Sequence, residues 1–140
     1  GLKYMKNKEQ ILKLSEEARN LIIESRNESS ILIGENLLKS IHVSEDGLTF
    51  TIESTYDGIE EFELTDISSV FRLEMDGWAM CSPSFYECLD NIKDELGYKY
   101  KKKSKDKFIN YVGKLYYAEY RCSEIYERLK DIENEASELL

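Results

Sequence analysis

The last third of the chain carries the pattern that most constrains the fold, a run of apolar or small residues spaced alternately by three and four. This heptad pattern keeps one stripe of a helix against a neighbouring element over its whole length. It predicts a long C-terminal helix that Ser104 can cap. The predicted seam consists of Phe108, Tyr111, Leu115, Ala118, Cys122, Ile125, Leu129, Ile132, Ala136 and Leu139. A helix of about 36 residues is about 54 Å long, so other elements must cover a long seam.

A second helical stripe runs from Tyr4 to about Arg26 and predicts an N-terminal helix. Its small residues Ala18 and Ser25 match small residues of the C-terminal seam, so we expect the two helices to pair antiparallel within the chain. A first helix of about 22 residues is only about 33 Å long, which leaves part of the seam uncovered. That surplus keeps a homodimer through the C-terminal helix open as an alternative.

Residues 27–41 combine helical and extended signals. Ser29 or Ser30 could cap a short helix, whereas Gly34 and the β-branched residues argue against one. The pattern favours a short second helix in this stretch.

The middle of the chain has the signature of β-hairpins. Asp-Gly between alternating apolar residues is the strongest short hairpin signal. It occurs at Asp46-Gly47, Asp57-Gly58 and Asp76-Gly77. These turns predict an antiparallel meander of four to five strands. At the first turn, a two-residue loop pairs Val43 with Phe50 and Ile41 with Ile52, and so places all four on one face.

The second turn is predicted to be a three-residue loop, residues 56–58, with Gly58 at positive φ. This register sets Ile52 opposite Phe62 on the apolar face and Glu53 opposite Glu61 on the outward face. The third hairpin would turn its large apolar side chains inward, namely Phe71, Leu73, Met75 and Trp78.

A compact helix should follow the meander. Ser82 is a good N-cap, Pro83 suits the first helical position, and Gly97 ends the apolar stripe. The predicted fold is therefore a single α+β domain spanning residues 1–140, with the long C-terminal helix packed on the apolar face of the sheet.

Several function classes find little support in the residues. No apolar run approaches the roughly 20 residues that a membrane span needs, and no signal peptide is evident. Three cysteines without CxxC spacing and one histidine, His42, favour a cytoplasmic protein without a metal or other cofactor. No nucleophile with a base, phosphate loop or metal cluster is present as a motif, so we expect no enzymatic activity.

The charges are distributed very unevenly. Residues 40–98 contain fourteen acidic residues against two basic ones, whereas residues 99–107 contain six lysines against one aspartate, in a chain of net charge -9. Only Arg72 could offset the carboxylates of the sheet. A surface tuned for solubility alone usually mixes both signs. We therefore predict a partner-binding face formed by Glu53, Asp57, Glu60, Glu61, Glu63, Glu74 and Asp76.

The sequence thus indicates a non-catalytic, acidic protein-binding protein. An inhibitor or antagonist of a basic, nucleic-acid-handling partner fits this charge map, as in phage anti-defence or toxin-immunity proteins. One alternative is a nucleic-acid-binding module that uses the Tyr/Lys segment 98–107, although the acidic sheet would oppose a polyanion. Another is a structural homodimer. The competing interpretation is a solvated acidic face that keeps the protein soluble and has no partner.

Overall fold

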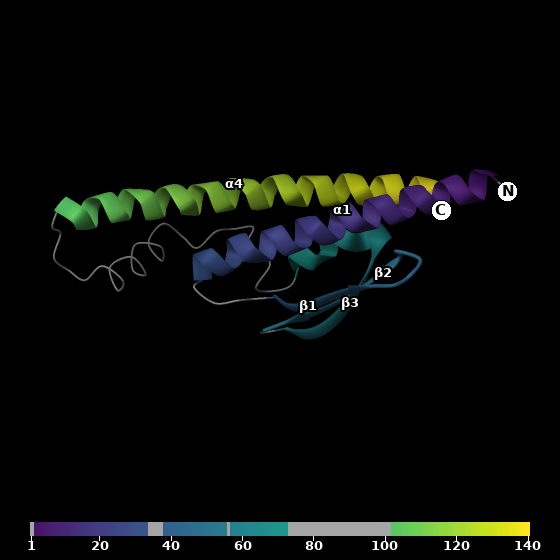
Figure 1. Cartoon of the computed structure of the whole chain (residues 1–140), viewed down its shortest axis with the longest axis horizontal. Helices are drawn as coiled ribbons and strands as arrows, with labels where there is room; N and C mark the ends of the chain where they lie inside the picture. Colours follow the sequence, from purple (N-terminus) through teal and green to yellow (C-terminus); the bar gives the residue numbers. More distant parts are fainter. Residues whose placement is uncertain (1, 34–37, 56, 73–101) are drawn as a thin grey trace.

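The computed structural model describes residues 2–33, 38–55, 57–72 and 102–140, and it confirms the α+β class (Figure 1). The elements are α1 (Leu2–Ile33), β1 (Leu38–Val43), β2 (Thr49–Ser54), β3 (Gly58–Glu63), the 3₁₀ segment η1 (Leu64–Arg72) and α4 (Lys102–Leu139). The strands form one antiparallel sheet in the order β1-β2-β3. The hairpin at Asp76-Gly77 and the helix predicted between Ser82 and Gly97 lie outside the described residues.

Helix α1 is longer than the sequence pattern predicted. It continues through residues 27–33, and β1 begins at Leu38, so the short second helix predicted within residues 27–41 is wrong. The physical reason is that no glycine or proline interrupts the chain between Leu2 and Ile33. Its buried stripe consists of Ile11, Ser15, Ala18, Ile22, Ser25 and Arg26.

Helix α4 confirms the C-terminal seam wherever its side chains are described. Cys122, Ile125, Leu129, Ile132 and Ala136 have no exposed surface, and Leu139 is partly buried. The helix begins at Lys102, so the predicted cap Ser104 lies inside its first turn. The side chains of Phe108, Tyr111, Leu115 and Ala118 lie outside the described part.

The two long helices pair antiparallel within the chain, as the small seam residues predicted (Figure 1). Near one end, the Asn7 side-chain amide donates to the Leu139 carbonyl at 3.2 Å. Further along, the Arg128 guanidinium donates to both carboxylate oxygens of Glu17, with N–O distances of 2.5 and 2.9 Å. These cross-links fix how far one helix is shifted along the other.

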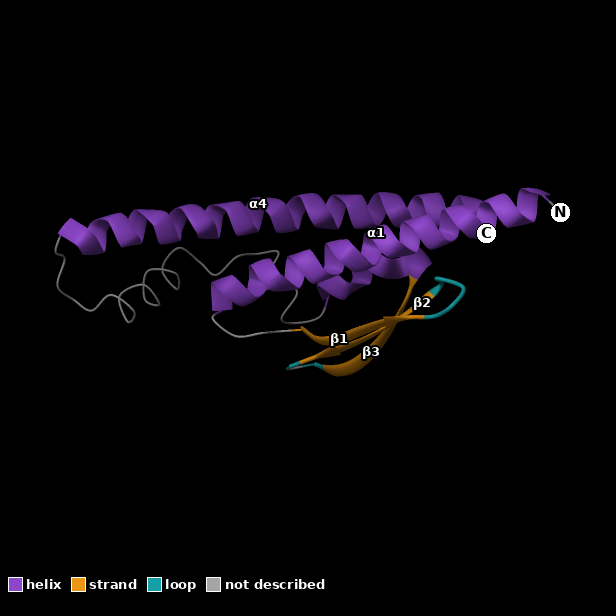
Figure 2. Cartoon of the chain, viewed as in Figure 1, coloured by secondary structure: helices purple, strands orange, loops and turns teal. Residues whose placement is uncertain are grey.

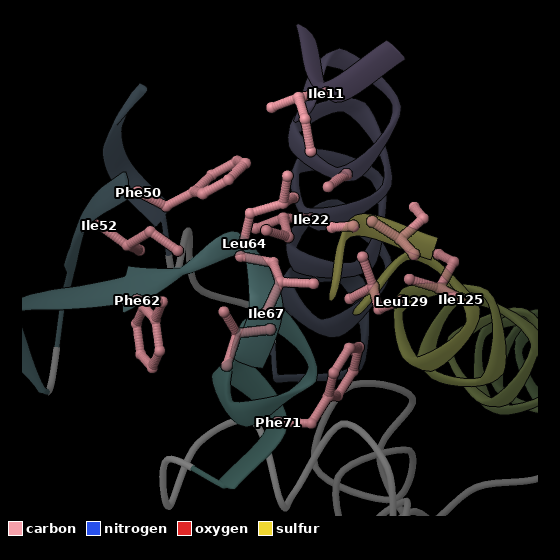
Figure 3. Close-up of a cluster of buried hydrophobic side chains, with 14 residues drawn as sticks. Ile11, Ile22, Phe50, Ile52, Phe62, Leu64, Ile67, Phe71, Ile125 and Leu129 are labelled. Carbon is pink, nitrogen blue, oxygen red and sulfur yellow. The ribbon is translucent and has the colours of Figure 1, made fainter. Parts of the chain in front are cut away.

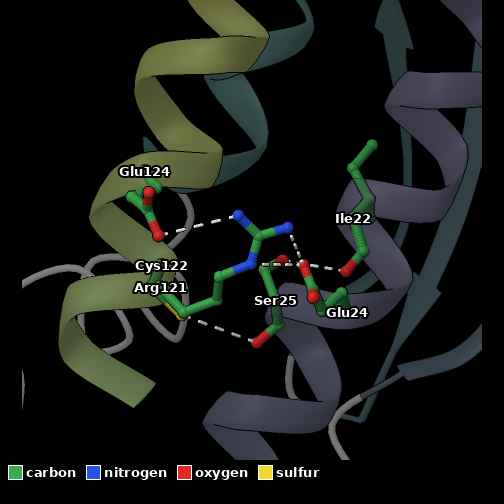
Figure 4. A network of polar contacts seen from close by, with 6 residues as sticks. All are labelled: Ile22, Glu24, Ser25, Arg121, Cys122 and Glu124. Atoms are coloured by element: carbon green, nitrogen blue, oxygen red, sulfur yellow. Dashed lines mark hydrogen bonds and ion pairs between the residues drawn. The ribbon is translucent and has the colours of Figure 1, made fainter. Parts of the chain in front are cut away.

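A third cross-link lies further along the same pair (Figure 4). Arg121 contacts Glu24 at 2.7 Å and Glu124 of its own helix at 3.7 Å. Beside it, the Cys122 Sγ lies 3.9 Å from the Ser25 carbonyl oxygen, and the Ser25 hydroxyl donates to the Ile22 carbonyl at 2.8 Å. The close approach is possible because Ser25 and Cys122 are small.

Segment η1 joins the sheet to both helices. Leu64, Ile67 and Val70 are fully buried at a spacing of three, and the backbone is kinked at Asp66 (φ -137°), so η1 consists of two short helical turns. The alternation of apolar residues predicted that the third hairpin begins at residues 70–72. These residues belong to η1 instead, so that part of the prediction is wrong. The predicted burial of Phe71 is confirmed. The Ser68 amide donates to Glu133 of α4 at 2.5 Å.

An aromatic and cationic stack reinforces this junction. The Phe71 ring meets Tyr126 of α4 edge-on at 5.6 Å, and the buried Arg26 guanidinium of α1 lies 5.8 Å from the Phe71 ring. Arg26 also donates to the Val70 carbonyl at 3.4 Å. Three elements are thus tied together around Phe71.

The core lies between the inner face of the sheet, η1 and the two helices (Figure 3). Phe50, Ile52 and Phe62 supply the sheet's part of it. The main contacts of α4 are with α1 and η1. Segment η1 and α1 therefore lie between α4 and the apolar face of the sheet, and α4 packs mainly on these two elements.

The first hairpin has the predicted register, with Val43 opposite Phe50 and Ile41 opposite Ile52. The predicted two-residue loop Asp46-Gly47 is wrong, because the Gly47 amide donates to the Ser44 carbonyl at 2.9 Å and the turn is therefore built from residues 44–47. The Asp46 carboxylate accepts from the Ser44 hydroxyl at 2.6 Å, which lowers the pKa of Asp46. Gly47 has a φ of 76°, which suits a glycine.

The second hairpin confirms Gly58 at positive φ, at 71°, but corrects the register. Ser54 pairs with Gly58 and Ile52 with Glu60, so the loop is residues 55–57, one residue earlier than predicted. The Ser54 hydroxyl, which accepts from the Asp57 amide at 3.2 Å, favours this position. The pairing shifts by two residues, so every side chain keeps its predicted face.

The burial of Leu129 should dominate the stability of the helix pair. Leu129→Ala should lower the free energy of unfolding by about 2 to 5 kcal/mol, because its fully buried side chain would leave a cavity. Chemical denaturation monitored by circular dichroism measures the loss. The matched control is Leu12→Ala, a leucine that is 38% exposed on α1, which should cost clearly less. Equal losses would contradict the packing described for the seam.

The two glycines provide a second test, because they share a backbone conformation but differ in free space. Gly58→Ala should cost about 1 to 2 kcal/mol through backbone strain alone, since no atom lies within 4 Å of the added Cβ. Gly47→Ala should cost more, because its Cβ would lie 3.1 Å from that of Ser15. Thermal and urea unfolding of both variants measures the difference. A smaller loss for Gly47→Ala would show that α1 does not press on this turn.

The Glu17–Arg128 pair should make stability depend on pH. The hydrogen bond from Arg128 lowers the pKa of the Glu17 carboxyl in the folded chain. Its contribution is therefore complete above the ordinary glutamate pKa and is lost as the pH falls through the lowered value. Glu17→Gln should cost about 0.2 to 1 kcal/mol at neutral pH, as for a partly exposed pair, and less in acid. Urea titrations at several pH values measure this, with the exposed Glu16→Gln as the control whose cost should stay small throughout.

Candidate functional site

One face of the sheet is free of any helix within the described part of the chain (Figure 2). The inner face meets α1 and η1, and the other face, called the open face below, points away from all helices in the picture. Strand alternation and the observed pairing define its members. The open face consists of Ser40 and His42 of β1, Thr49, Thr51 and Glu53 of β2, and Ile59, Glu61 and Glu63 of β3.

The open face is arranged in rows that run across the strands. Thr49 lies opposite Glu63, and Thr51 lies opposite Glu61. Ser40, Glu53 and Ile59 form another row. A carboxylate therefore occupies each row, and two of the three carboxylates lie on β3, at the edge of the sheet.

The charge of this face is strongly one-sided. Glu61 and Glu63 are exposed, and Glu53 is partly exposed. Lys39 is the single lysine or arginine in the three strands, against four glutamates. Arg72 was predicted to offset the carboxylates on this face. It belongs to η1 rather than to the sheet, so that prediction is wrong.

The predicted direct opposition of Glu53 and Glu61 is wrong. Glu53 lies opposite Ile59, and Glu61 lies opposite Thr51. The two carboxylates are diagonal neighbours instead, which places their Cβ atoms roughly 7 Å apart rather than about 5 Å. Repulsion between them is therefore weaker than the sequence register implied, and the acidic face costs less stability than expected.

The remaining predicted site residues divide into three groups. Glu60 is exposed but pairs with Ile52, so it lies on the inner side of β3. Asp57 lies in the loop that precedes β3. Both are close in sequence to the open face and add negative charge at its rim. Glu74 and Asp76 lie outside the described residues.

Sequence reasoning missed one prominent member, Ile59. Its side chain is 69% exposed, among the most exposed large apolar residues of the described chain. Glu53 lies across from it, and Glu61 is its next neighbour on the same face of β3. The available signal was the alternation of β3, which places Ile59 on the side opposite Phe62. Ile59 is therefore an apolar side chain that a partner would bury on binding, although a single exposed apolar residue is common on protein surfaces.

β3 is also an edge strand. Residues 58–61 are exposed on both faces, and β2 is the one strand paired with β3 in the described sheet. Charged side chains on an edge strand commonly prevent unwanted strand pairing. This protective role accounts for Glu60 and Glu61 without any partner, but it does not account for the exposed Ile59.

The described residues offer little for catalysis. They contain no group of three or more His, Cys, Asp or Glu side chains able to hold a metal ion. A hollow of about 400 Å³ lies between α1 and α4, lined in part by Lys13, Glu17 and Glu135. Arg128 forms ion pairs with both glutamates, which offsets one of their two negative charges.

Comparisons of the chain with protein-family models, curated proteins and solved structures give no match. Among the described helices, none has the length and apolar character needed to cross a membrane.

Proposed function

We propose that the protein is a non-catalytic binding protein whose open face engages a basic partner protein and inhibits it. One observation carries this proposal: Ile59 is 69% exposed beside Glu53 and Glu61, in a sheet whose three strands contain four glutamates and one lysine, Lys39. An apolar anchor supplies affinity through burial, and the carboxylates around it select a cationic surface and speed the encounter.

The two contributions have different physical roles. Burying most of an isoleucine side chain contributes on the order of 1.5 to 3 kcal/mol. The carboxylates on an exposed rim contribute less affinity each, but they raise the association rate and make it depend on salt. A partner surface that carries an apolar pocket within a field of lysine or arginine matches both requirements.

Among basic partners, a nucleic-acid-handling protein is the class we favour. The groove of such a protein is rich in lysine and arginine because it neutralises phosphates. An acidic strand face that occupies the groove would exclude the nucleic acid, which is the action of an antagonist. Anti-defence proteins of phages and toxin-immunity proteins work as inhibitors of this general class, in the cytoplasm. The charge of the open face is the feature that favours this class of partner.

The test reverses charge on the open face. Glu61→Lys combined with Glu63→Lys should leave the fold intact, because both side chains are exposed. It should weaken binding at least tenfold to a basic protein purified by affinity capture from the source cells, and should reduce the salt dependence of association. Isothermal titration and stopped-flow association at two salt concentrations measure both effects.

Two controls make the test specific. Glu9→Lys with Glu16→Lys changes the net charge equally but on the exposed side of α1, and should alter affinity little. Ile59→Ser should slow association little but speed dissociation. Unchanged affinity in the open-face variant would refute the proposal.

The same titrations examine the nucleic-acid alternative. Lys101, Lys102 and Lys103 changed together to glutamate should have a small effect on the protein partner. If instead the unmodified chain binds a single-stranded oligonucleotide and this lysine variant loses that binding, the Tyr/Lys segment 98–107 is the functional site and the acidic-face proposal fails.

A further inference from the structure

The side of α4 turned away from α1 and η1 carries an unusual set of exposed side chains. We call it the outer face, and it consists of Tyr117, Tyr120, Glu124, Glu127, Asp131 and Glu138, all of which are exposed. Tyr117 and Tyr120 are 59% and 64% exposed, although tyrosine usually buries most of its ring. The buried seam of the same helix lies on the opposite side, because Ile125, Leu129 and Ile132 have no exposed surface.

Helix α4 is also polarised in charge from end to end. Residues 102–107 contain four lysines against one aspartate, whereas residues 131–139 contain four acidic residues and no basic one. The helix spans 38 residues, from Lys102 to Leu139, so its midpoint falls between Tyr120 and Arg121. The exposed tyrosines therefore lie near the middle of the helix, between a basic end and an acidic end.

We propose that the outer face of α4 pairs with the same face of a second copy of the chain, antiparallel, about a two-fold axis close to Tyr120. This arrangement brings the tyrosines of both copies together at the axis. It also sets residues 102–107 of each copy beside the acidic last turns of the other. Antiparallel helix dipoles oppose each other, which favours the same orientation.

The charge distribution along α4 favours an antiparallel second copy over a parallel copy or a uniformly basic partner. A parallel pair would place lysines beside lysines and carboxylates beside carboxylates. A uniformly basic partner would match the acidic half and be repelled by the lysine half. A partner with a reversed charge gradient of the same length matches the whole helix, and the antiparallel copy has that gradient by symmetry.

This dimer differs from one built on the apolar seam of α4. Leu129 and its neighbours are buried within one chain, so that seam is no longer free to pair with a second copy. The outer face lies on the other side of α4, and α1 with η1 separates α4 from the sheet (Figure 1). The inference therefore does not rest on the proposed function of the open face.

The first test is the mass of the intact chain in solution, measured by sedimentation equilibrium at low and high salt. We expect a dimer that weakens as salt rises. Tyr117→Ser with Tyr120→Ser should raise the dissociation constant at least tenfold, because central aromatic residues dominate such interfaces. Ile59→Ser, an equally exposed apolar residue on the sheet, is the matched control and should leave the dimer unchanged. A monomer at all concentrations would refute the proposal.

A charge-exchange experiment tests the orientation. One variant carries Lys102→Glu and Lys105→Glu, so both ends of α4 are acidic, and the other carries Asp131→Lys and Glu138→Lys, which weakens the acidic end. Each variant alone should dissociate, and an equimolar mixture should form heterodimers. Circular dichroism checks that both remain helical. Failure of the mixture to associate, with both variants folded, would overturn the antiparallel pairing.

Photo-crosslinking locates the contacts. A benzoylphenylalanine at position 120 should crosslink to residues near 117–124 of the second copy, and one at position 131 should crosslink near residue 110, as the helix bounds require. Mass spectrometry of the crosslinked peptides identifies the sites. Crosslinks from 131 to 131 would indicate a parallel pair, and crosslinks to another protein of the source cells in place of the second copy would identify a different occupant. Either result contradicts the proposal.

Discussion

Close antiparallel packing of α1 on α4 is the constraint on which the rest of the structure depends. The small residues Ala18, Ser25 and Cys122 let the helices approach, and at that separation Arg128 can bind both oxygens of Glu17. Each helix covers only part of the buried stripe of the other. Segment η1 packs on the remaining part of the α4 stripe. The sheet packs on α1 through β1 and on η1 through β3, so its orientation, and with it the open face, depends on this helical junction.

The sequence predicted those features that depend on periodicity. The seam of α4, the antiparallel pair and the first hairpin register all follow from regular spacing. The register of the second hairpin could not be deduced from alternation. A shift of two residues leaves Phe50, Ile52 and Phe62 on the same face, so both registers give the same apolar pattern. A side-chain hydrogen bond at Ser54 distinguishes the two loops. For Val70 and Phe71, the strand-forming residue types predicted a strand, whereas the structure places both residues in the helical turn of η1 after the kink at Asp66.

The same limit applies to the open face. Its carboxylates could be predicted, since charge and alternation place Glu53, Glu61 and Glu63 outward in either register. Their mutual arrangement could not, because the register decides whether Glu53 faces Glu61 or Ile59. In the observed register, an apolar side chain replaces a like charge at that position. Glu53 and Glu61 therefore repel each other less than direct opposition would require.

The two proposals also constrain each other geometrically. The outer face of α4 and the open face of the sheet lie on opposite sides of the layer formed by α1 and η1 (Figure 1). A dimer through α4 would therefore leave both open faces accessible and turned away from the two-fold axis. Such a dimer could bind two basic sites at once only if they lie far apart, on separate partner molecules or on an extended assembly. If the sites are close together on one partner, each open face must act alone, and dimerisation then contributes stability to α4 rather than affinity.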